Sequence, residues 1–269
     1  MTKLVRDLMH RGLLTCRPDA TLGQVAVLLN QNHVHALIVT DREGRALGVI
    51  SDYDLLAGEW LSSDPESHTV MRKLTAADLM SQPVDSVESD LPLSEAVNAL
   101  IEKQISRLLV TEKGKPVGVI ALSSFVASIA REEEPKRETV GDVMSDAVLV
   151  CRGKTPILSA ARTMTQAGWR SVLVVDAKGK VLGVVSGRSL LPFVKNGIDE
   201  GLVVRDVMHK PLTIDIHASL REAADKMIQN HHHRLIVVDD SDPEAFPLGI
   251  ISSFDIVAAM AHPDSVWQK

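Results

Sequence analysis

Apolar and polar residues alternate along the chain in a pattern that repeats four times. Four segments place apolar residues near i, i+3, i+4 and i+7, which predicts amphipathic helices. These segments read TLGQVAVLLNQN, LSEAVNALIEKQ, ILSAARTMTQAG and LREAADKMIQNH. Each is followed by a β-branched run that predicts a buried strand, namely ALIVTD, RLLVTE, SVLVVD or RLIVVD. After a turn, a second strand (GVIS, GVIA, GVVS or GIIS) leads into another helix.

A short phrase opens each copy and fixes the register of the repeat. The phrases RDLM, ADLM, GDVM and RDVM end at Met9, Met80, Met144 and Met208. An extended stretch follows each phrase, so that every unit has the order strand, helix, strand, strand, helix. We expect the four units to span residues 1–60, 74–131, 138–198 and 202–262. The linkers Trp60–Lys73 and Arg131–Thr139 would then separate successive units, and the second would divide the chain into the halves 1–134 and 135–269.

The second helix of the unit begins with Ser-x-x-Asp in the first and fourth copies. The pairs are Ser51 with Asp54 and Ser252 with Asp255. Such a spacing is typical of a capping box, which stabilises a helix and has no further function. The same helix start also favours a phosphate, and a carboxylate can accept hydrogen bonds from ribose hydroxyls.

The other two copies have lost this acid. The corresponding pairs are Ala121 with Ser124 and Ser186 with Ser189. A cap needed for folding alone would be expected in all four helices, whereas each half of the chain holds one intact motif. The asymmetry therefore favours ligand binding and predicts one site in each half.

Composition narrows the class of protein. The net charge is −6 and no block of Lys and Arg occurs, which argues against nucleic acid as a partner. No apolar run approaches the length of a membrane span, and the N-terminus lacks the apolar core of a secretory signal. With two cysteines, Cys16 and Cys151, a disulfide framework is not expected. We expect a cytoplasmic protein that does not bind membranes.

The sequence offers no catalytic or metal-binding motif. It contains no phosphate-binding P-loop and no Gly-x-Ser-x-Gly, and we expect no catalytic residue and no enzymatic activity. The run His231–His233 could suggest a metal, but three adjacent residues cannot all face one ion, and no other ligand has zinc spacing nearby. A helix end is the favoured interpretation for this run.

Taken together, the D-h-M openings (h, an apolar residue), the h-h-V-x-D strands and the G-h-h-S-x-x-D turns resemble the cystathionine-β-synthase (CBS) domain family over nearly the whole chain. The resemblance implies an α/β (α+β) fold of four CBS units, paired into two pseudo-two-fold Bateman modules with sheets face to face and helices outside. It also implies adenosine-ligand binding in the clefts between paired units.

The resemblance further implies which residues bind the ligand. The set is Thr15, His35, Gly48, Ile50, Ser51, Asp54, Arg107, Arg170, Arg188, Thr213, His233, Arg234, Gly249, Ile251, Ser252 and Asp255. The acid would hold the ribose, the serine would lie near the phosphate, and the isoleucines would surround adenine. The basic residues would face the phosphate. We expect Arg107 to serve the ligand held by Asp54, and Arg170 and Arg188 to serve the one held by Asp255.

These features predict a non-catalytic regulatory protein that senses energy state by binding AMP, ADP or ATP, with no catalytic cofactor and no metal. S-adenosylmethionine or NAD is the alternative ligand, and an interaction scaffold with vestigial sites is the alternative function. Since the four units occupy the chain, we expect it to act on an unidentified protein partner. It would do so either as a single-chain disc or as a homodimer.

Overall fold

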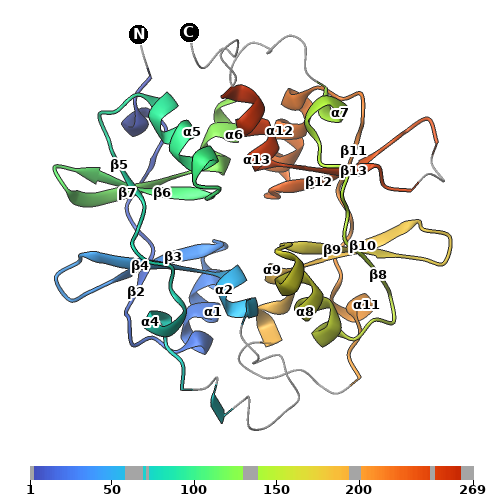
Figure 1. Ribbon diagram of the computed structural model, residues 1–269, viewed down its shortest axis with the longest axis horizontal. Coiled ribbons are helices and arrows are strands. Elements are labelled where there is room, and N and C mark those ends of the chain that lie inside the picture. The colour runs from blue at the N-terminus through green and yellow to red at the C-terminus, as the bar shows by residue number, and fades with distance from the viewer. Residues whose placement is uncertain are drawn as a thin grey trace. The chain divides into compact units, whose positions relative to one another are not determined.

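A computed structural model describes residues 3–57, 69–70, 73–129, 139–193, 201–242 and 246–261 of the 269-residue chain. Helices and strands alternate through these residues, as the apolar periodicity predicts, and four small sheets result (Figure 1). Most of the expected linkers Trp60–Lys73 and Arg131–Thr139 lies outside the described residues.

The first two repeats share one order of elements, to which the first repeat adds the short strand β1. In the first repeat, a single 3-10 turn at Val5–Asp7 precedes β1 (His10–Arg11), β2 (Thr15–Cys16), α1 (Leu22–Gln31), β3 (Ala36–Thr40), β4 (Ala46–Ser51) and α2 (Asp52–Ala57). The second repeat contains α4 (Ala76–Leu79), β5 (Ser86–Glu88), α5 (Leu93–Glu102), β6 (Arg107–Glu112), β7 (Lys115–Ala121) and α6 (Leu122–Ile129).

The last two repeats follow the same plan. The third contains α7 (Val140–Val143), β8 (Val150–Arg152), α8 (Ile157–Ala167), β9 (Ser171–Val175), β10 (Val181–Ser186) and α9 (Gly187–Leu190). The fourth contains α11 (Val204–Val207), β11 (Thr213–Asp215), α12 (Leu220–Gln229), β12 (Arg234–Val238), β13 (Gly249–Ser252) and α13 (Ser253–Met260).

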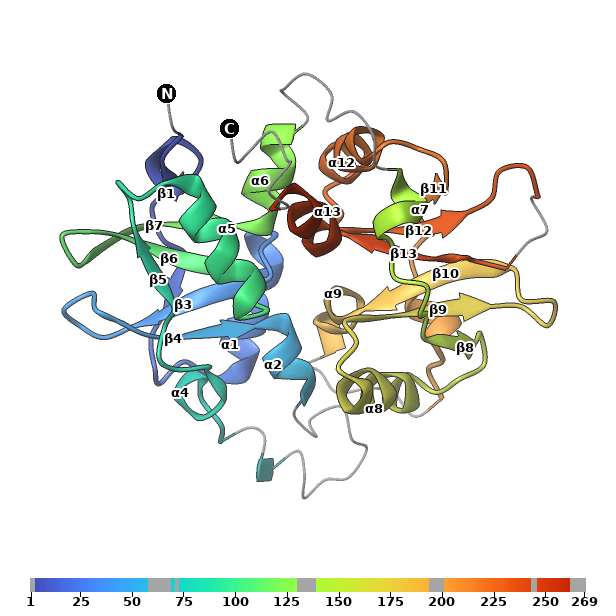
Figure 2. The same cartoon turned by 45° about the horizontal axis from the view of Figure 1, so that its top comes forward.

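Each repeat builds a sheet of one topology. Its first strand runs parallel to the second, and the second pairs antiparallel with the third, as in β8, β9 and β10 (Figure 2). In the first repeat Thr15 lies opposite Ile38, and Val39 lies opposite Gly48. A helix-linked parallel pair beside an antiparallel hairpin is therefore present in all four copies.

The long helix of each repeat buries the apolar face that its sequence predicts. In α1 the buried residues are Leu22, Val25, Ala26 and Leu29, which follow the i, i+3, i+4, i+7 rule. Thr21 caps this helix: its side chain accepts the N–H of Gln24, and the Gln24 side chain accepts the N–H of Thr21 at 2.9 Å. This capping box satisfies amide groups that have no partner inside the helix.

The opening segments are exchanged between consecutive repeats. The opening of repeat one contributes β1 to the edge of β7, in repeat two. The openings of repeats two, three and four make isolated bridges to repeats one, four and three, through Ser81 with Val49, Ser145 with Ile250, and His209 with Val184. Each opening thus pairs with the sheet of its neighbour rather than with its own.

A glycine on each receiving strand makes this exchange possible. A Cβ atom at Gly118 would lie 2.2 Å from the carbonyl oxygen of His10, and one at Gly249 would lie 2.3 Å from that of Ser145. At Gly48 the nearest atom would be Sδ of Met80, at 2.5 Å. A larger side chain would push the exchanged segment away from the sheet.

The chain divides into two compact units, each of which takes one repeat from either half. The first comprises Met1–Leu13, Asp85–Val148 and Leu212–Lys269, and the second comprises Leu14–Val84 and Leu149–Pro211. Repeats two and four therefore share one unit, and repeats one and three share the other. The grouping of consecutive repeats into modules 1–134 and 135–269 stays a prediction.

Each compact unit has its own aliphatic core. In the first unit α6 packs against α12 and α13, which lie together in Figure 1. Its largest fully buried side chains include Leu100, Leu108 and Phe125 from repeat two. In the second unit α2 packs against α8 and α9, and Leu55 joins Met164 in one apolar cluster. No helix within the described residues is long and apolar enough to cross a membrane.

Candidate functional site

The start of α2 holds the Asp54 carboxylate in a fixed position. Oδ2 of Asp54 accepts the backbone N–H and the hydroxyl of Ser51, both at 2.7 Å. The Ser51 hydroxyl in turn accepts the N–H of Asp54 at 3.3 Å. This is the reciprocal geometry of a capping box, so the structural interpretation of Ser-x-x-Asp is confirmed.

The start of α13 repeats this arrangement. Oδ2 of Asp255 accepts the N–H and the hydroxyl of Ser252 at 2.7 Å each, and the N–H of Asp255 donates to the Ser252 hydroxyl at 3.5 Å. Among the described residues, Oδ1 of neither carboxylate accepts a hydrogen bond. Each acid therefore keeps one oxygen available to a ligand.

Serine caps the equivalent helices of the other two repeats. The Ser124 hydroxyl accepts the N–H of Ala121 at 3.3 Å, and the Ser189 hydroxyl accepts the N–H of Ser186 at 3.2 Å. Oγ of Ser189 also lies 3.1 Å from Nδ1 of His209. Since all four helices satisfy this amide group, the sequence argument that a cap would need the acid was wrong. What distinguishes repeats one and four is the carboxylate itself.

Burial and a nearby cation act on Asp54 in opposite directions. Burial raises the pKa of the Asp54 carboxyl above its usual value, and the charge of Asp52 acts in the same direction. The hydrogen bonds from Ser51 and the positive charge of Arg170 act to lower that pKa without reversing the shift. A group that is costly to ionise and lies beside a cation is typical of functional sites.

Arg170 lies beside the Asp54 motif, in the same compact unit. Its guanidinium carbon is 5.6 Å from the centre of the Tyr53 ring, which is within cation–π range. We expected Arg170 and Arg188 to serve a ligand held by Asp255. The structure instead places both in the unit that contains Asp54, where Nη2 of Arg188 lies 2.8 Å from Nδ1 of His33.

Tyr53 is a residue that sequence reasoning missed. It is the one tyrosine of the chain and sits between Ser51 and Asp54; Phe254 holds the same place before Asp255. The repeats that lack the acid have Ser123 and Arg188 there. In a chain with 3% aromatic residues, an aromatic side chain beside each acid was the available signal.

The predicted basic residues occupy two strand positions rather than one. Arg107 and Arg234 begin their strands, opposite Ala121 and Ser252. His35, Arg170 and His233 each come one residue before a strand. Successive residues on an extended chain point to opposite sides, so the five side chains do not form a single phosphate-facing row.

His35 has a partner within its own repeat. Its Nδ1 lies 2.8 Å from Oδ2 of Asp52, whose side chain is 11% exposed. His35 and Asp52 are also tied through the backbone, because the N–H of Asp52 donates to the His35 carbonyl at 3.0 Å. The Nδ1 atom of His35 is therefore engaged by Asp52, and the expectation that His35 faces the phosphate stays a prediction.

The apolar residues expected around adenine belong to the cores. Ile50 and Ile251 are fully buried in the clusters of the second and first compact units. That placement argues against contact with a bound base. Gly48 and Gly249 receive the exchanged openings, so packing explains both. Of the two threonines, Thr15 is exposed on β2 and Thr213 is half-buried on β11.

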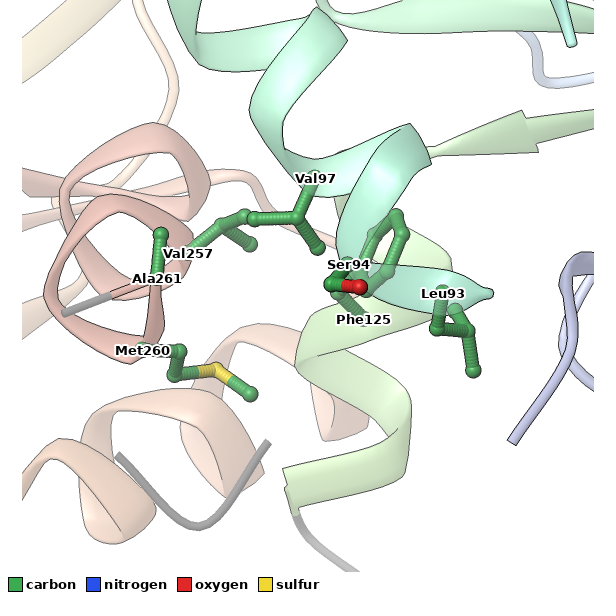
Figure 3. A pocket seen from close by; sticks show the side chains of 7 residues that line it. All are labelled: Leu93, Ser94, Val97, Phe125, Val257, Met260 and Ala261. Atoms are coloured by element: carbon green, nitrogen blue, oxygen red, sulfur yellow. The ribbon is translucent and has the colours of Figure 1, made fainter. Parts of the chain in front are cut away.

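Two hollows among the described residues have neither Asp54 nor Asp255 in their lining. One is an apolar gap of about 10 Å³ among α5, α6 and α13, where Val97, Phe125 and Val257 converge (Figure 3). This volume is about that of one water-sized probe, so the gap cannot hold a nucleotide. The other is an open hollow beside Arg152 and Arg205, in the third repeat and the opening of the fourth.

The described residues contain no group of three potential metal ligands. The histidine run continues from the end of α12, where the N–H groups of His231 and His232 donate to carbonyls of the helix at 3.1 and 2.9 Å. The expectation that this run forms a helix end is confirmed.

Comparison with known proteins finds one family model that matches all four repeats. The family model for the CBS domain matches residues 5–59, 76–131, 140–196 and 204–262. The chain is similar to the uncharacterized protein MJ1404 of Methanocaldococcus jannaschii, with 26% identity over 275 residues that cover 96% of this chain and 62% of that protein. The chain thus spans less than two thirds of the length of MJ1404.

Two further proteins match this chain over most of its length and over most of their own. The 5'-AMP-activated protein kinase subunit gamma of Kluyveromyces lactis is 25% identical over 273 residues, which cover 89% of this chain and 82% of that subunit. The crystal structure of protein MJ1225 from Methanocaldococcus jannaschii has a TM-score of 0.83 at 17% identity, and the match covers 96% of this chain and 99% of that one. At that identity the second match shows the fold alone.

Proposed function

Since the chain belongs to the CBS domain family, as its four repeats indicated, we propose that it is a non-catalytic regulatory protein that binds adenine nucleotides. One nucleotide would bind at Asp54 and a second at Asp255. The relationship to a kinase subunit named for activation by 5'-AMP supports a regulatory role for an adenosine-type ligand. AMP, ADP and ATP are the ligands we propose, in a cytoplasmic protein that acts on a protein partner.

The observation that carries the proposal is the second oxygen of each acid. Serine performs the same capping in repeats two and three, so capping does not require a carboxylate at this position. In repeats one and four the carboxylate is fixed through Oδ2, and Oδ1 accepts no hydrogen bond within the described residues. A fixed acceptor of this kind suits the vicinal hydroxyls of a ribose.

The surroundings of Asp54 add a place for charge and for a ring. Arg170 brings a guanidinium group, which binds phosphate oxygens in pairs, to within 5.6 Å of the Tyr53 ring. A phosphate there would exchange the weak contact with the ring for a charge-assisted hydrogen bond. This predicts that ligands with a phosphate bind better than the nucleoside alone.

The repeats supply the substitution that tests the proposal. Asp54→Ser and Asp255→Ser copy the residues that cap the equivalent helices, so both variants should fold. Isothermal titration with AMP, ADP and ATP should give two sites in the unsubstituted protein, one in each single variant and none in the double variant. Ser124→Ala is the matched control, because it removes a cap and leaves both acids in place.

Three outcomes would contradict the proposal. Unchanged stoichiometry in Asp54→Ser and Asp255→Ser would mean that the acids are helix caps and nothing more. Binding of S-adenosylmethionine or NAD in place of the nucleotides would keep the site and reject the ligand. Binding of none of these compounds by the unsubstituted protein would favour the interaction scaffold.

A further inference from the structure

An open hollow of about 400 Å³ lies at the carboxyl ends of β8 and β9, entirely within the second compact unit. Its lining comes from three segments of sequence: residues 152–154, the start of the β9–β10 turn at Val175–Ala177, and Arg205 at the start of α11. In Figure 1 α11 lies beside β8. The volume is within the range of small-molecule sites in proteins.

Three of the lining side chains are cations without an anionic partner. Arg152, Lys154 and Arg205 form no ion pair and no side-chain hydrogen bond with any residue that the structure describes. The one acid in the lining, Asp176, is engaged in its own turn, because its Oδ1 accepts the N–H groups of Lys178 and Lys180 at 2.9 Å each. The hollow therefore has an uncompensated positive charge.

The backbone holds Arg205 against the floor of this hollow. Its N–H donates to the carbonyl of Gly153 at 3.2 Å, and the next bond along joins the N–H of Val204 to the carbonyl of Thr155 at 2.9 Å. The guanidinium lies over Gly153, where a Cβ atom would be 2.9 Å from Nε and 3.1 Å from Nη2. Because Gly153 has no side chain, the guanidinium of Arg205 can pack directly against its backbone.

The other three repeats provide an internal comparison, because the backbone bond to Gly153 recurs in each of them. The equivalent donors and acceptors are Ala77 to Pro18 at 2.9 Å, Arg6 to Ser89 at 2.9 Å, and Gly141 to Ile216 at 2.8 Å. Each other sheet has at most one arginine or lysine at the three positions equivalent to Arg152, Lys154 and Arg205. The first sheet has Arg17, Asp19 and Ala77 there. The second has Glu88, Asp90 and Arg6, and the fourth has Asp215, His217 and Gly141. Three cations come together in the third sheet alone.

We propose that this hollow is an anion site that binds a phosphate-bearing small molecule through Arg152, Lys154 and Arg205, separately from the sites at Asp54 and Asp255. Guanidinium groups bind phosphate oxygens bidentately, and a lysine adds a compact charge. A ligand with two or more negative charges matches the three cations. Because these side chains face solvent, binding weakens as the salt concentration rises.

The test uses pyrophosphate as the probe and the full chain as the protein. Titration followed by amide NMR spectra at low salt should shift signals of residues 152–154, 176–177 and 205, with one site per chain. Lys154→Gln combined with Arg205→Gln should raise Kd by about tenfold or more, since each removes a charge-assisted hydrogen bond. Gly153→Ala should also weaken binding, because it displaces the guanidinium of Arg205.

Two controls make the result specific. Arg17→Gln changes the residue equivalent to Arg152 in another sheet and should leave Kd unchanged. Asp54→Ser with Asp255→Ser should also leave it unchanged, which separates this site from the proposed nucleotide sites. The proposal is overturned if pyrophosphate shifts no signal at the hollow, if Arg17→Gln weakens binding as much as the double variant does, or if the probe binds only at the two acids.

Discussion

At the start of α2, the Asp54 carboxylate lies in surroundings that make its charge costly. Burial raises the pKa of this group, although two hydrogen bonds from Ser51 and the nearby Arg170 act against that rise. At the start of α4, the Asp78 carboxylate accepts the same capping hydrogen bond from the backbone of Thr75, but its pKa shifts in the opposite direction. Hydrogen bonds from the backbone and side chain of Thr75 lower the pKa of the Asp78 carboxyl.

These two acids should give opposite pH dependences of stability. A raised pKa means that the folded protein holds the Asp54 proton more tightly than the unfolded chain does. Protonated Asp54 therefore contributes to the free energy of unfolding at low pH. This contribution is lost as pH rises from the ordinary pKa of 3.8 through the raised pKa of the folded protein. We therefore expect Asp54→Asn to gain stability relative to the unsubstituted protein as pH rises through this window, measured by melting temperature at a series of pH values.

Asp78→Asn is the control of opposite sign. A lowered pKa stabilises the folded state above the ordinary value of 3.8, and this stability is lost as pH falls through the lowered pKa. Asp78→Asn should therefore lose stability relative to the unsubstituted protein as pH rises. Parallel melting curves for Asp54→Asn and the unsubstituted protein at all pH values would contradict the first expectation.

Individual residues show how far the sequence determines a site. The cap geometry of Ser51 and Asp54 was predictable because it is local, spanning one turn of helix. The placement of Ile50 in the core was not, since strand alternation gives two faces without saying which one is covered. Likewise, Arg170 could not be assigned to Asp54 from the sequence, because the two residues are brought together by packing between repeats one and three.

At the scale of elements, the exchanged openings depend on glycine. The receiving strands of repeats two and four carry Gly118 and Gly249, over which a carbonyl oxygen of the exchanged segment passes. Apolar periodicity predicted the long helix, the strands on either side of it, the third strand and the closing helix of each repeat. It predicted neither the short helices of the openings, such as α4, nor the parallel pairing of the first strand. It could not predict the exchange, because an opening of a few residues has nothing in its local sequence that specifies which sheet it joins.

Enlarging a receiving glycine should separate the opening from the sheet. Gly249→Ala would place Cβ 2.3 Å from the carbonyl oxygen of Ser145. Because the overlapping atom belongs to the backbone, the backbone must move to relieve the overlap. We expect a loss of about 1–3 kcal/mol in the free energy of unfolding, as for overpacked cores. Urea denaturation measures this directly.

Gly23→Ala is the matched control. Gly23 lies in α1, and an added Cβ there meets no atom within 4 Å. Alanine favours helix over glycine, so this variant should be as stable as the unsubstituted protein or up to about 1 kcal/mol more stable. Equal stability of Gly249→Ala and Gly23→Ala would show that the opening yields without cost.

At the scale of the whole molecule, each core combines a repeat from the first half with a repeat from the second. Phe125 of repeat two is fully buried in the core that also holds Met227 and Leu235 of repeat four. Four copies of one unit were evident from the sequence. The association of repeat two with four and of one with three was not, because the helix faces of all copies are alike in character.

Removing the Phe125 side chain should therefore destabilise repeats two and four together. We expect Phe125→Ala to cost about 3–5 kcal/mol, the usual range for a buried aromatic residue. Native-state hydrogen exchange should show reduced protection in β6 and β12 alike, with a smaller change in β3 and β9.

An exposed aromatic residue serves as the control. Phe246 is 54% exposed, and Phe246→Ala should change stability by no more than about 0.5 kcal/mol. If Phe125→Ala reduced protection in repeat two and left repeat four unaffected, the shared core would not act as a cooperative unit.

The reciprocal exchange of openings also constrains how such a chain can arise and change. A gene segment that encodes one repeat would yield a sheet with a bare edge and an opening with no sheet to join. Two consecutive repeats satisfy each other, as β1 does with β7, and Ser81 with Val49. Duplication or deletion in steps of two repeats would then keep every opening paired, whereas a chain of three would carry an unpaired opening that favours pairing with another copy.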